Sequence, residues 1–182
     1  MDISAEAIQK WSHELEAFEP QPWDRMPEIY LYMDQVLSYM EKQLQLFDRN
    51  GEGLLTSSMI NNYVKAGVLP RPDRKKYARE HLAMLTMICM LKSSLSIPDI
   101  SSLINLLLED SSEKEMYGNF CEAQRLAMEE VCSRLDSGTS GGRRELIRLA
   151  AELSIEAAMR RAAAERILSE LSCEPHETVE ES

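Results

Sequence analysis

The most concentrated charge chemistry of this sequence lies in one short segment, from Thr56 to Leu82. Six cations in it are opposed only by Asp73 and Glu80, so the segment carries a net +4 and leaves −15 on the rest of a chain whose formal net charge is −11. Such a positive patch is typical of a surface that contacts phosphate groups. A solvated surface loop is the alternative for so short a basic run. The cations are Lys65, Arg71, Arg74, Lys75, Lys76 and Arg79.

A short helix is predicted within this segment, over Ser57–Ala66. Thr56 or Ser57 can cap its first turn, Gly67 follows where a left-handed residue ends a helix, and Pro70 prevents continuation. Asparagine can hold an adenine edge through two hydrogen bonds, while serine and lysine can hold phosphates or bases. The polar residues that this helix carries are Ser57, Ser58, Asn61, Asn62 and Lys65.

The loop after the helix, Arg71–Tyr77, is expected to lie along a phosphate backbone because basic residues dominate it. A helix for the DNA groove followed by a basic loop is the layout of a winged helix-turn-helix. The predicted DNA contacts are therefore Ser57, Ser58, Asn61, Asn62 and Lys65 on the helix, and Arg71, Arg74, Lys75, Lys76, Tyr77 and Arg79 after it.

A second candidate chemistry is calcium binding, because the residues from Asp48 to Met59 imitate an EF-hand loop. With Asp48 as the first position, Asn50 and Glu52 fall at ligand positions and Gly53 at the turn position. Met59 stands where calcium requires a bidentate glutamate, and the sequence has no second loop of this kind. We therefore favour a polar turn between two helices over a calcium site.

No other set of residues forms a catalytic or metal-binding pattern. The four cysteines are irregularly spaced and the three histidines are far apart, so the sequence predicts neither a disulfide framework nor a zinc centre. His81 is expected on the surface. We predict no enzyme activity, no cofactor and no metal. The sulfur-containing residues at helical spacing are interpreted as core rather than as a soft-metal site: Met84, Met87, Cys89 and Met90.

The elements that must position these residues are almost all helical, so an all-α fold is predicted. The chain has 182 residues and is 44% hydrophobic, which is sufficient for a buried core. The predicted helices are one with Ile8, Trp11, Leu15 and Phe18 on its buried face, then Pro27–Phe47 with Ile29 inward, Ser57–Ala66, Arg79–Lys92, a helix capped by Ser96, Ser112–Leu135 and Arg143–Leu171.

We divide the chain into four parts: 1–27, an N-terminal helix and Pro-rich link; 28–110, the DNA-binding domain; 111–172, C-terminal helices for dimerisation or effector binding; and 173–182, an acidic disordered tail. Residues 137–142 are rich in Ser and Gly, which predicts a flexible connector. The last helix has an apolar seam that suits either packing on its own domain or a dimer contact. We favour a homodimer contact within 112–171.

The segment from Thr56 to Ile100 resembles the DNA-binding domain of MerR-type regulators. The resemblance rests on the string TSSMINNYVKAGVL, the Lys76-Tyr77 pair, the apolar spacing after it and the LSIxxI joint that ends at Ile100. The string MINNYVKAGVLPRP with KKY is also similar to an uncharacterised bacterial domain family placed near MerR. The resemblance implies a MerR-like winged helix-turn-helix with additional N- and C-terminal helices, whose Ser57–Ala66 helix enters the major groove.

These observations lead us to expect a transcriptional regulator that binds double-stranded DNA as a homodimer, with an effector that the sequence does not identify. The N-terminus lacks the basic start and apolar run of a secretory signal, and no stretch is apolar enough to span a membrane. A cytoplasmic location without a membrane partner is therefore expected. The alternative function, favoured by the acidic net charge, is a protein-interaction module that keeps the fold and does not bind DNA.

Overall fold

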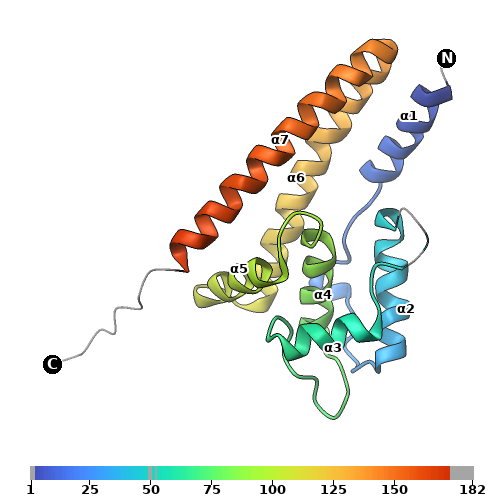
Figure 1. The fold of residues 1–182 in the computed structure, drawn as a ribbon. Helices are drawn as coiled ribbons and strands as arrows, with labels where there is room; N and C mark the ends of the chain where they lie inside the picture. The colour runs from blue at the N-terminus through green and yellow to red at the C-terminus, as the bar shows by residue number, and fades with distance from the viewer. Residues whose placement is uncertain (1–2, 49–50, 52, 173–182) are drawn as a thin grey trace.

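The computed structural model of the chain describes residues 3–48, 51 and 53–172, and within them every regular element is a helix (Figure 1). The all-α prediction is confirmed. No helix in these ranges combines the length and the apolar character that a bilayer crossing requires. The α-helices of the described residues are α1 (Ile3–Glu16), α2 (Met33–Leu44), α3 (Ser57–Lys65), α4 (Arg79–Leu91), α5 (Ile97–Glu109), α6 (Glu113–Ser140) and α7 (Gly142–Leu171).

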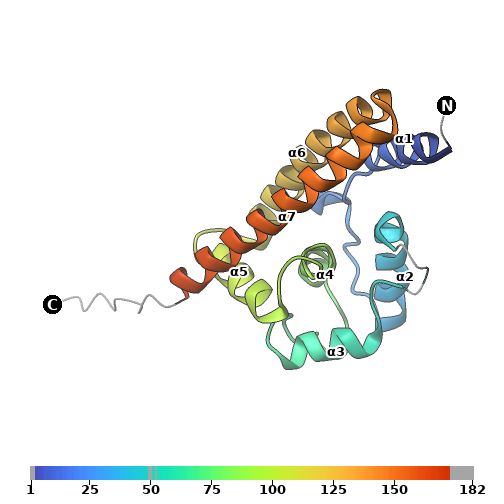
Figure 2. The ribbon, with the colours of Figure 1, turned by 45° about the horizontal axis from the view of Figure 1, so that its top comes forward.

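Helix α4 forms the centre of the core because it is apolar on every side. All its residues from His81 to Cys89 are buried, and α2, α5 and α6 pack around it (Figure 2). Thr86 is polar within this stretch, and its Oγ1 donates to the Leu82 carbonyl oxygen at 2.9 Å, so its hydroxyl is satisfied inside the helix. The interpretation of the sulfur-containing residues as core is confirmed: Met84, Met87 and Cys89 are buried, and Met90 packs against them.

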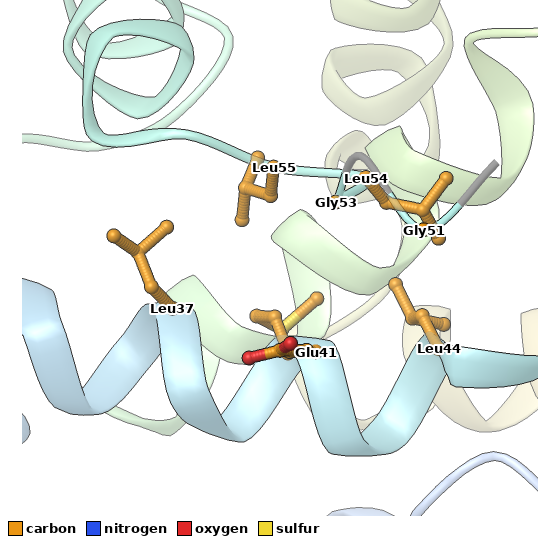
Figure 3. Close-up of a pocket in the computed structure, with 8 residues that line it drawn as sticks. Leu37, Glu41, Leu44, Gly51, Gly53, Leu54 and Leu55 are labelled. Atoms are coloured by element: carbon orange, nitrogen blue, oxygen red, sulfur yellow. The ribbon is translucent and has the colours of Figure 1, made fainter. Parts of the chain in front are cut away.

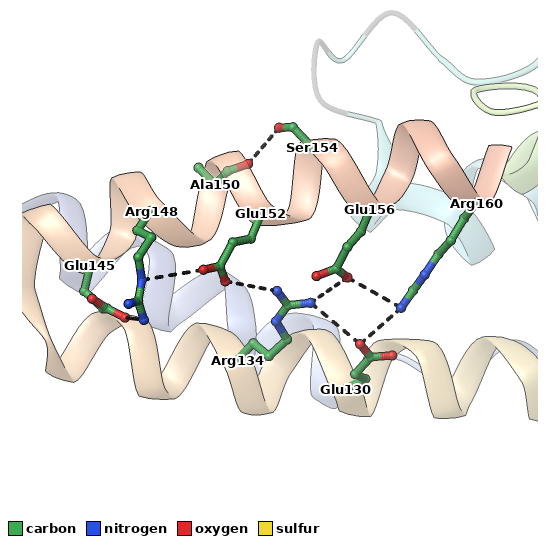
Figure 4. A network of polar contacts seen from close by, with 9 residues as sticks. All are labelled: Glu130, Arg134, Glu145, Arg148, Ala150, Glu152, Ser154, Glu156 and Arg160. Atoms are coloured by element: carbon green, nitrogen blue, oxygen red, sulfur yellow. Dashed lines mark hydrogen bonds and ion pairs between the residues drawn. The ribbon is translucent and has the colours of Figure 1, made fainter. Parts of the chain in front are cut away.

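Helices α6 and α7 form a long hairpin whose facing sides carry ion pairs (Figure 4). Arg134 of α6 reaches Glu156 of α7 at 2.7 Å, and Arg160 of α7 reaches Glu130 of α6 at 3.3 Å. A single exposed ion pair contributes little to stability, but several pairs across one helix contact fix how the two helices are aligned.

The segment expected to be a flexible connector, 137–142, is instead the closed end of this hairpin. Helix α6 continues to Ser140, and only Gly141 and Gly142 turn the chain. Gly138 lies inside α6, where an added Cβ would come within 2.8 Å of the Leu149 side chain on α7. Glycine therefore allows two helices to approach closely here, and composition alone could not distinguish that use from flexibility.

Helix α1 packs on α6 with Leu15 buried, as expected. Trp11, which was also expected inward, is 38% exposed, and Ser12 is buried instead. Ser12 Oγ donates to Asp136 Oδ1 at 3.3 Å, and its carbonyl oxygen accepts from the Cys132 thiol at 3.6 Å. These polar contacts with α6 place a serine inward, which a hydrophobic pattern does not predict.

The helix expected to begin at Pro27 begins only at Met33. Leu31 forms an isolated antiparallel bridge with Tyr77, and Ile29, which was expected inward, is 71% exposed. Proline suits the first turn of a helix, but the pairing with Tyr77 holds this segment extended. The error arises because the deciding partner lies far along the chain.

The residues immediately before α3 return over α2. Leu55 lies toward Leu37 and Leu54 toward Leu44, around a pocket of about 220 Å³ (Figure 3). Lys92, directly after α4, donates from Nζ to the Leu54 carbonyl oxygen. This segment therefore links α2 to the end of α4 and fixes where α3 begins.

Candidate nucleic-acid interface

Helix α3 forms because local signals mark its start and one side of it is apolar. The Thr56 hydroxyl oxygen accepts the Met59 N–H at 3.2 Å, so Thr56 is the N-cap. Ile60 and Tyr63 are buried at 0% and 6% exposure. The predicted helix over 57–66 is confirmed, with Lys65 as its last residue.

Gly67 ends α3 with a φ of +77°. In this left-handed conformation the chain reverses, and the N–H groups of Val68 and Leu69 return to the Tyr63 carbonyl oxygen at 3.0 and 3.2 Å. The side chains of Val68 and Leu69 are buried. The basic loop is therefore anchored directly beside the exit of α3.

The basic loop contains a tight turn over Asp73–Lys76. The Lys76 N–H donates to the Asp73 carbonyl oxygen at 2.8 Å, and Arg74 and Lys75 have φ angles of +48° and +66°. Two successive positive φ values are typical of a type I′ turn, for which Asn and Gly are favoured. A left-handed conformation costs other residues about 1–2 kcal/mol each. The chain thus keeps two cations where the backbone favours other residues, which indicates a use for those side chains.

Backbone pairing with the segment before α2 fixes the base of this turn. The Leu31 N–H donates to the Tyr77 carbonyl oxygen at 2.9 Å, and the Tyr77 N–H donates back at 2.8 Å. Next to this bridge, Lys76 Nζ lies 5.6 Å from the centre of the Tyr32 ring, which is a cation–π contact. The turn is therefore a fixed feature of the fold.

We group the exposed polar residues of α3 with the cations of the loop that follows it, and call this set the α3–turn surface. Asn61 and Lys65 lie one helical turn apart and, with Val64 and Arg71, line a shallow depression of about 360 Å³. The helix and the start of the loop thus meet at one hollow. The surface consists of Ser57, Ser58, Asn61, Asn62, Lys65, Arg71, Arg74 and Lys75, all exposed, and of Lys76, which is half-buried.

The cations of the α3–turn surface have no carboxylate partner among the described residues. By contrast, six arginines of α6 and α7 each lie within salt-bridge distance of a glutamate: Arg125, Arg134, Arg148, Arg160, Arg161 and Arg166. On a protein with a strong excess of acidic residues, a group of cations without internal partners suits an external anion.

Two predicted contact residues lie behind this surface, which corrects their assignment. Tyr77 is 3% exposed, and its ring packs edge-on against His81 with centroids 5.5 Å apart. Arg79 Nη2 donates to the Met26 carbonyl oxygen at 3.1 Å, and its guanidinium lies 5.9 Å from the Trp23 ring. Both side chains hold the start of α4 in place and do not face outward with the other cations.

His81, which was expected on the surface, is buried at 5% exposure. Its Nδ1 accepts the Ala78 N–H at 3.1 Å and so caps the first turn of α4. Burial lowers the pKa of His81 below its usual 6.5, although the Glu80 carboxylate, 3.6 Å away, opposes this shift. The imidazole is therefore neutral at pH 7 and structural.

Sequence reasoning missed an exposed apolar group beside the turn. Ile29, Tyr30 and Tyr32 are 71%, 60% and 51% exposed, and they flank Leu31 in the bridge. The run IYLY contains only β-branched, aromatic and apolar residues, which is typical of an extended segment. That signal could have located the pairing segment, although not its partner.

The polar-turn interpretation of the EF-hand-like loop rests on Asp48. Its Oδ2 accepts the Gly53 N–H at 2.9 Å, which is the local role that aspartate has in turns. Asn50 and Glu52 lie outside the described residues. In the part of the chain that the structure describes, no group of three or more His, Cys, Asp or Glu side chains could hold a metal ion.

Comparison with known proteins gives a family match over more than half of the chain. A family model described as "Domain of unknown function (DUF1836)" matches residues 21–122, which include α2 to α5, the basic turn and the start of α6. No curated protein and no solved structure matches the chain. The match agrees with the expected likeness to an uncharacterised domain family, and it adds no likeness to MerR-type regulators.

Proposed function

Because the chain belongs to the DUF1836 family, whose description names no activity, we propose a function from the geometry of its own surface. The chain binds double-stranded DNA sequence-specifically, as a transcriptional regulator of MerR-like type. In this proposal α2, α3 and α4 form the helical part of a winged helix-turn-helix, and the turn over Asp73–Lys76 forms a short wing.

The observation that carries the proposal is the pair of cations in the strained turn. Arg74 and Lys75 adopt positive φ angles that other residues would adopt at lower cost. Neither has a carboxylate partner among the described residues, so no internal contact accounts for them. A phosphate backbone beside the turn would use both charges, and phosphate contacts are what fix a protein on a duplex.

The polar face of α3 suits base readout next to those phosphate contacts. Asn61 and Asn62 are exposed near the middle of the helix, and Lys65 follows one turn later. Asparagine is suited to a bidentate contact with adenine in the major groove. We therefore assign base contacts to the asparagines, and phosphate contacts to Lys65 and to the cations of the loop.

We also propose that the regulator is a homodimer, since paired half-sites give a small domain enough contacts to select one site. The support is the set of exposed apolar side chains on α7, among which Ile155 and Met159 lie one turn apart on the same side. The exposed apolar residues of this helix are Ile147, Ile155, Met159, Ile167 and Leu171, with exposures from 45% to 66%. A helix that buried its apolar residues only in its own chain would expose fewer of them.

A titration of labelled duplex DNA with the full chain, followed by fluorescence anisotropy over a range of salt concentrations, tests the proposal. If Lys65, Arg71, Arg74, Lys75 and Lys76 each neutralise one phosphate, the slope of log affinity against log salt is about −4.5 per protomer. Arg71→Ala should reduce that slope by about 0.9. Arg161→Ala is the matched control, because it removes the same charge from an arginine paired with Glu165 on α7.

A salt-independent signal, or no binding at low salt, would remove DNA as the ligand. It would favour a protein-interaction module, and the exposed Ile29, Tyr30 and Tyr32 support that second candidate. Equal slopes for Arg71→Ala and Arg161→Ala would show that DNA affinity depends on the net charge of the chain and not on the α3–turn surface.

A further inference from the structure

Another cavity lies away from the α3–turn surface, between the link that follows α1 and the first half of α6. Its volume is about 330 Å³, which is within the range of small-molecule sites. Phe18, Trp23 and the two prolines of the link form one side, and Tyr117 and Cys121 of α6 form the other. The wall is therefore mainly aromatic and apolar.

Gly118 of α6 keeps this cavity open. It lies within a 28-residue helix, where glycine is among the least favourable residues. Its φ is not positive, and an added Cβ would meet no atom within 4 Å, so neither backbone conformation nor close packing requires glycine there. Gly138 of the same helix differs, because an added Cβ would meet Leu149 at 2.8 Å. The space over Gly118 is part of the cavity, and a larger side chain would fill it.

The cavity is held in shape without a ligand. The Tyr117 hydroxyl donates to the Gln21 carbonyl oxygen at 3.0 Å, and Lys114 Nζ donates to both Asp24 carboxylate oxygens at 2.8 and 3.0 Å. These contacts hold the link against α6 at Gln21 and at Asp24, which flank Trp23 in the sequence. A pre-formed cavity loses little free energy to ordering when a ligand binds.

Both cations at the rim are already paired, whereas Glu19, which also lines the cavity, has no salt-bridge partner among the described residues. Lys114 is held by Asp24, and Arg125 is held by Glu122 at 2.7 Å as well as by Glu129. Neither cation needs a further anion. A negatively charged ligand would have to displace one of these pairs, whereas a ligand without negative charge would not.

We propose that this cavity binds a small ring compound without a negative charge, whose rings pack against Trp23 over the space that Gly118 leaves. The site is independent of DNA binding. Its recognition is by apolar contact and ring stacking on Trp23, and the Cys121 thiol and the Glu19 carboxylate also belong to the lining.

The probe for a test is N-phenyl-1-naphthylamine, an uncharged dye whose emission rises in apolar surroundings. The chain has two tryptophans, so Trp11→Phe leaves Trp23 as the only energy donor. The full chain with this substitution should bind the dye saturably and transfer excitation from Trp23 to it. Adding Gly118→Leu should weaken binding at least about tenfold, because the new side chain occupies the cavity.

Ala127→Leu, at an exposed position of α6 outside the cavity, is the matched control and should leave dye affinity unchanged. Gly118→Leu should remain folded, as circular dichroism can verify, because leucine is a better helix former than glycine and its Cβ meets no neighbour within 4 Å. Gly118→Ala is a smaller second blocking variant. Equal dye affinity in the blocking and control variants, or the absence of saturable transfer from Trp23, would overturn the proposal.

Discussion

Leu31 and Tyr77 each donate a backbone N–H to the other's carbonyl oxygen, at 2.9 and 2.8 Å, and both side chains are buried. The base of the basic turn therefore belongs to the core, while the cations Arg74 and Lys75, only a few residues away, face solvent. Stability and anion binding are thus assigned to different residues of one short segment, and substitutions can separate them.

The first prediction separates Tyr77 from Arg71. Tyr77→Ala should lower the free energy of unfolding by about 3 kcal/mol, because it removes a buried aromatic ring beside His81. Arg71→Ala should change it by no more than about 0.5 kcal/mol, because the side chain is exposed. Urea unfolding followed by circular dichroism measures both. A loss for Tyr77→Ala as small as that for Arg71→Ala would contradict the core position of the ring.

The second prediction concerns the turn itself. The double variant Arg74→Asn, Lys75→Gly should raise the free energy of unfolding by about 1–2 kcal/mol, because both new residues suit the positive φ angles. The same variant should reduce the salt slope of DNA binding by about 1.8, for two lost phosphate contacts. Lys65→Ala is the control: it should reduce the slope by about 0.9 without stabilising the fold. A double variant that gains no stability would refute the strained turn.

The third prediction concerns base readout by α3. Asn61→Ala or Asn62→Ala should lose discrimination at one or two base pairs, by about 1–3 kcal/mol, with little change in affinity for random DNA. Lys75→Ala with Lys76→Ala should weaken binding to specific and random duplexes alike. Selection from a random duplex pool, followed by competition titrations, measures both effects. If all these variants lost affinity uniformly, α3 would contact only the DNA backbone.

The fourth prediction concerns assembly through α7. Ile155→Lys with Met159→Lys should convert a dimer into a monomer, because both side chains are more than half exposed in the isolated chain. Truncation of α7 is a poorer test, since Leu168 is part of the main core. Light scattering at tens of micromolar reports the mass. Ser154→Lys, which adds a like charge next to Ile155, is the control. A monomeric mass for the unaltered chain would end the dimer proposal.

The fifth prediction follows from the buried imidazole of His81. Its pKa is lowered in the folded state, so below about pH 6.5 the unfolded chain binds a proton that the folded chain does not. The free energy of unfolding is therefore not reduced by His81 above that pH. It falls as the pH decreases toward the folded-state pKa of His81.

His81→Asn keeps an acceptor near the Ala78 N–H but cannot titrate. It should therefore lose less melting temperature between about pH 7 and about pH 5 than the unaltered chain. Glu80→Gln should steepen the acid dependence, because it removes the carboxylate that opposes the shift. Identical profiles for all three proteins would show that other groups control the acid response.

The features that the sequence predicted correctly are those with local causes. Thr56 and Gly67 lie at the two ends of α3 and act on the helix that they flank, so their residue types sufficed. The inward position of Leu82, Leu85 and Ile88 followed from helical spacing in the same way. Helices of this kind can be predicted from the residues that form and flank them.

The errors involve contacts between distant parts of the chain. Residues before Met33 are extended because Leu31 pairs with Tyr77, and Ser12 is buried because α6 supplies Asp136 and Cys132. The inward position of Tyr77 has the same origin. None of these partners is visible in the residues themselves, and the positive φ angles of Arg74 and Lys75 contradict local preference altogether.

Helix α4 has no side that faces water between His81 and Cys89, and this affects how the protein opens as well as how it packs. A backbone amide in that stretch can reach solvent only when the helices around it separate together. Deuterium should therefore enter these amides at the rate of whole-chain opening, far more slowly than it enters the amides of the basic turn. A ligand that binds only the folded chain stabilises it against this opening. Its binding should therefore slow deuterium exchange of the α4 amides, so these amides report ligand occupancy wherever on the chain the ligand binds.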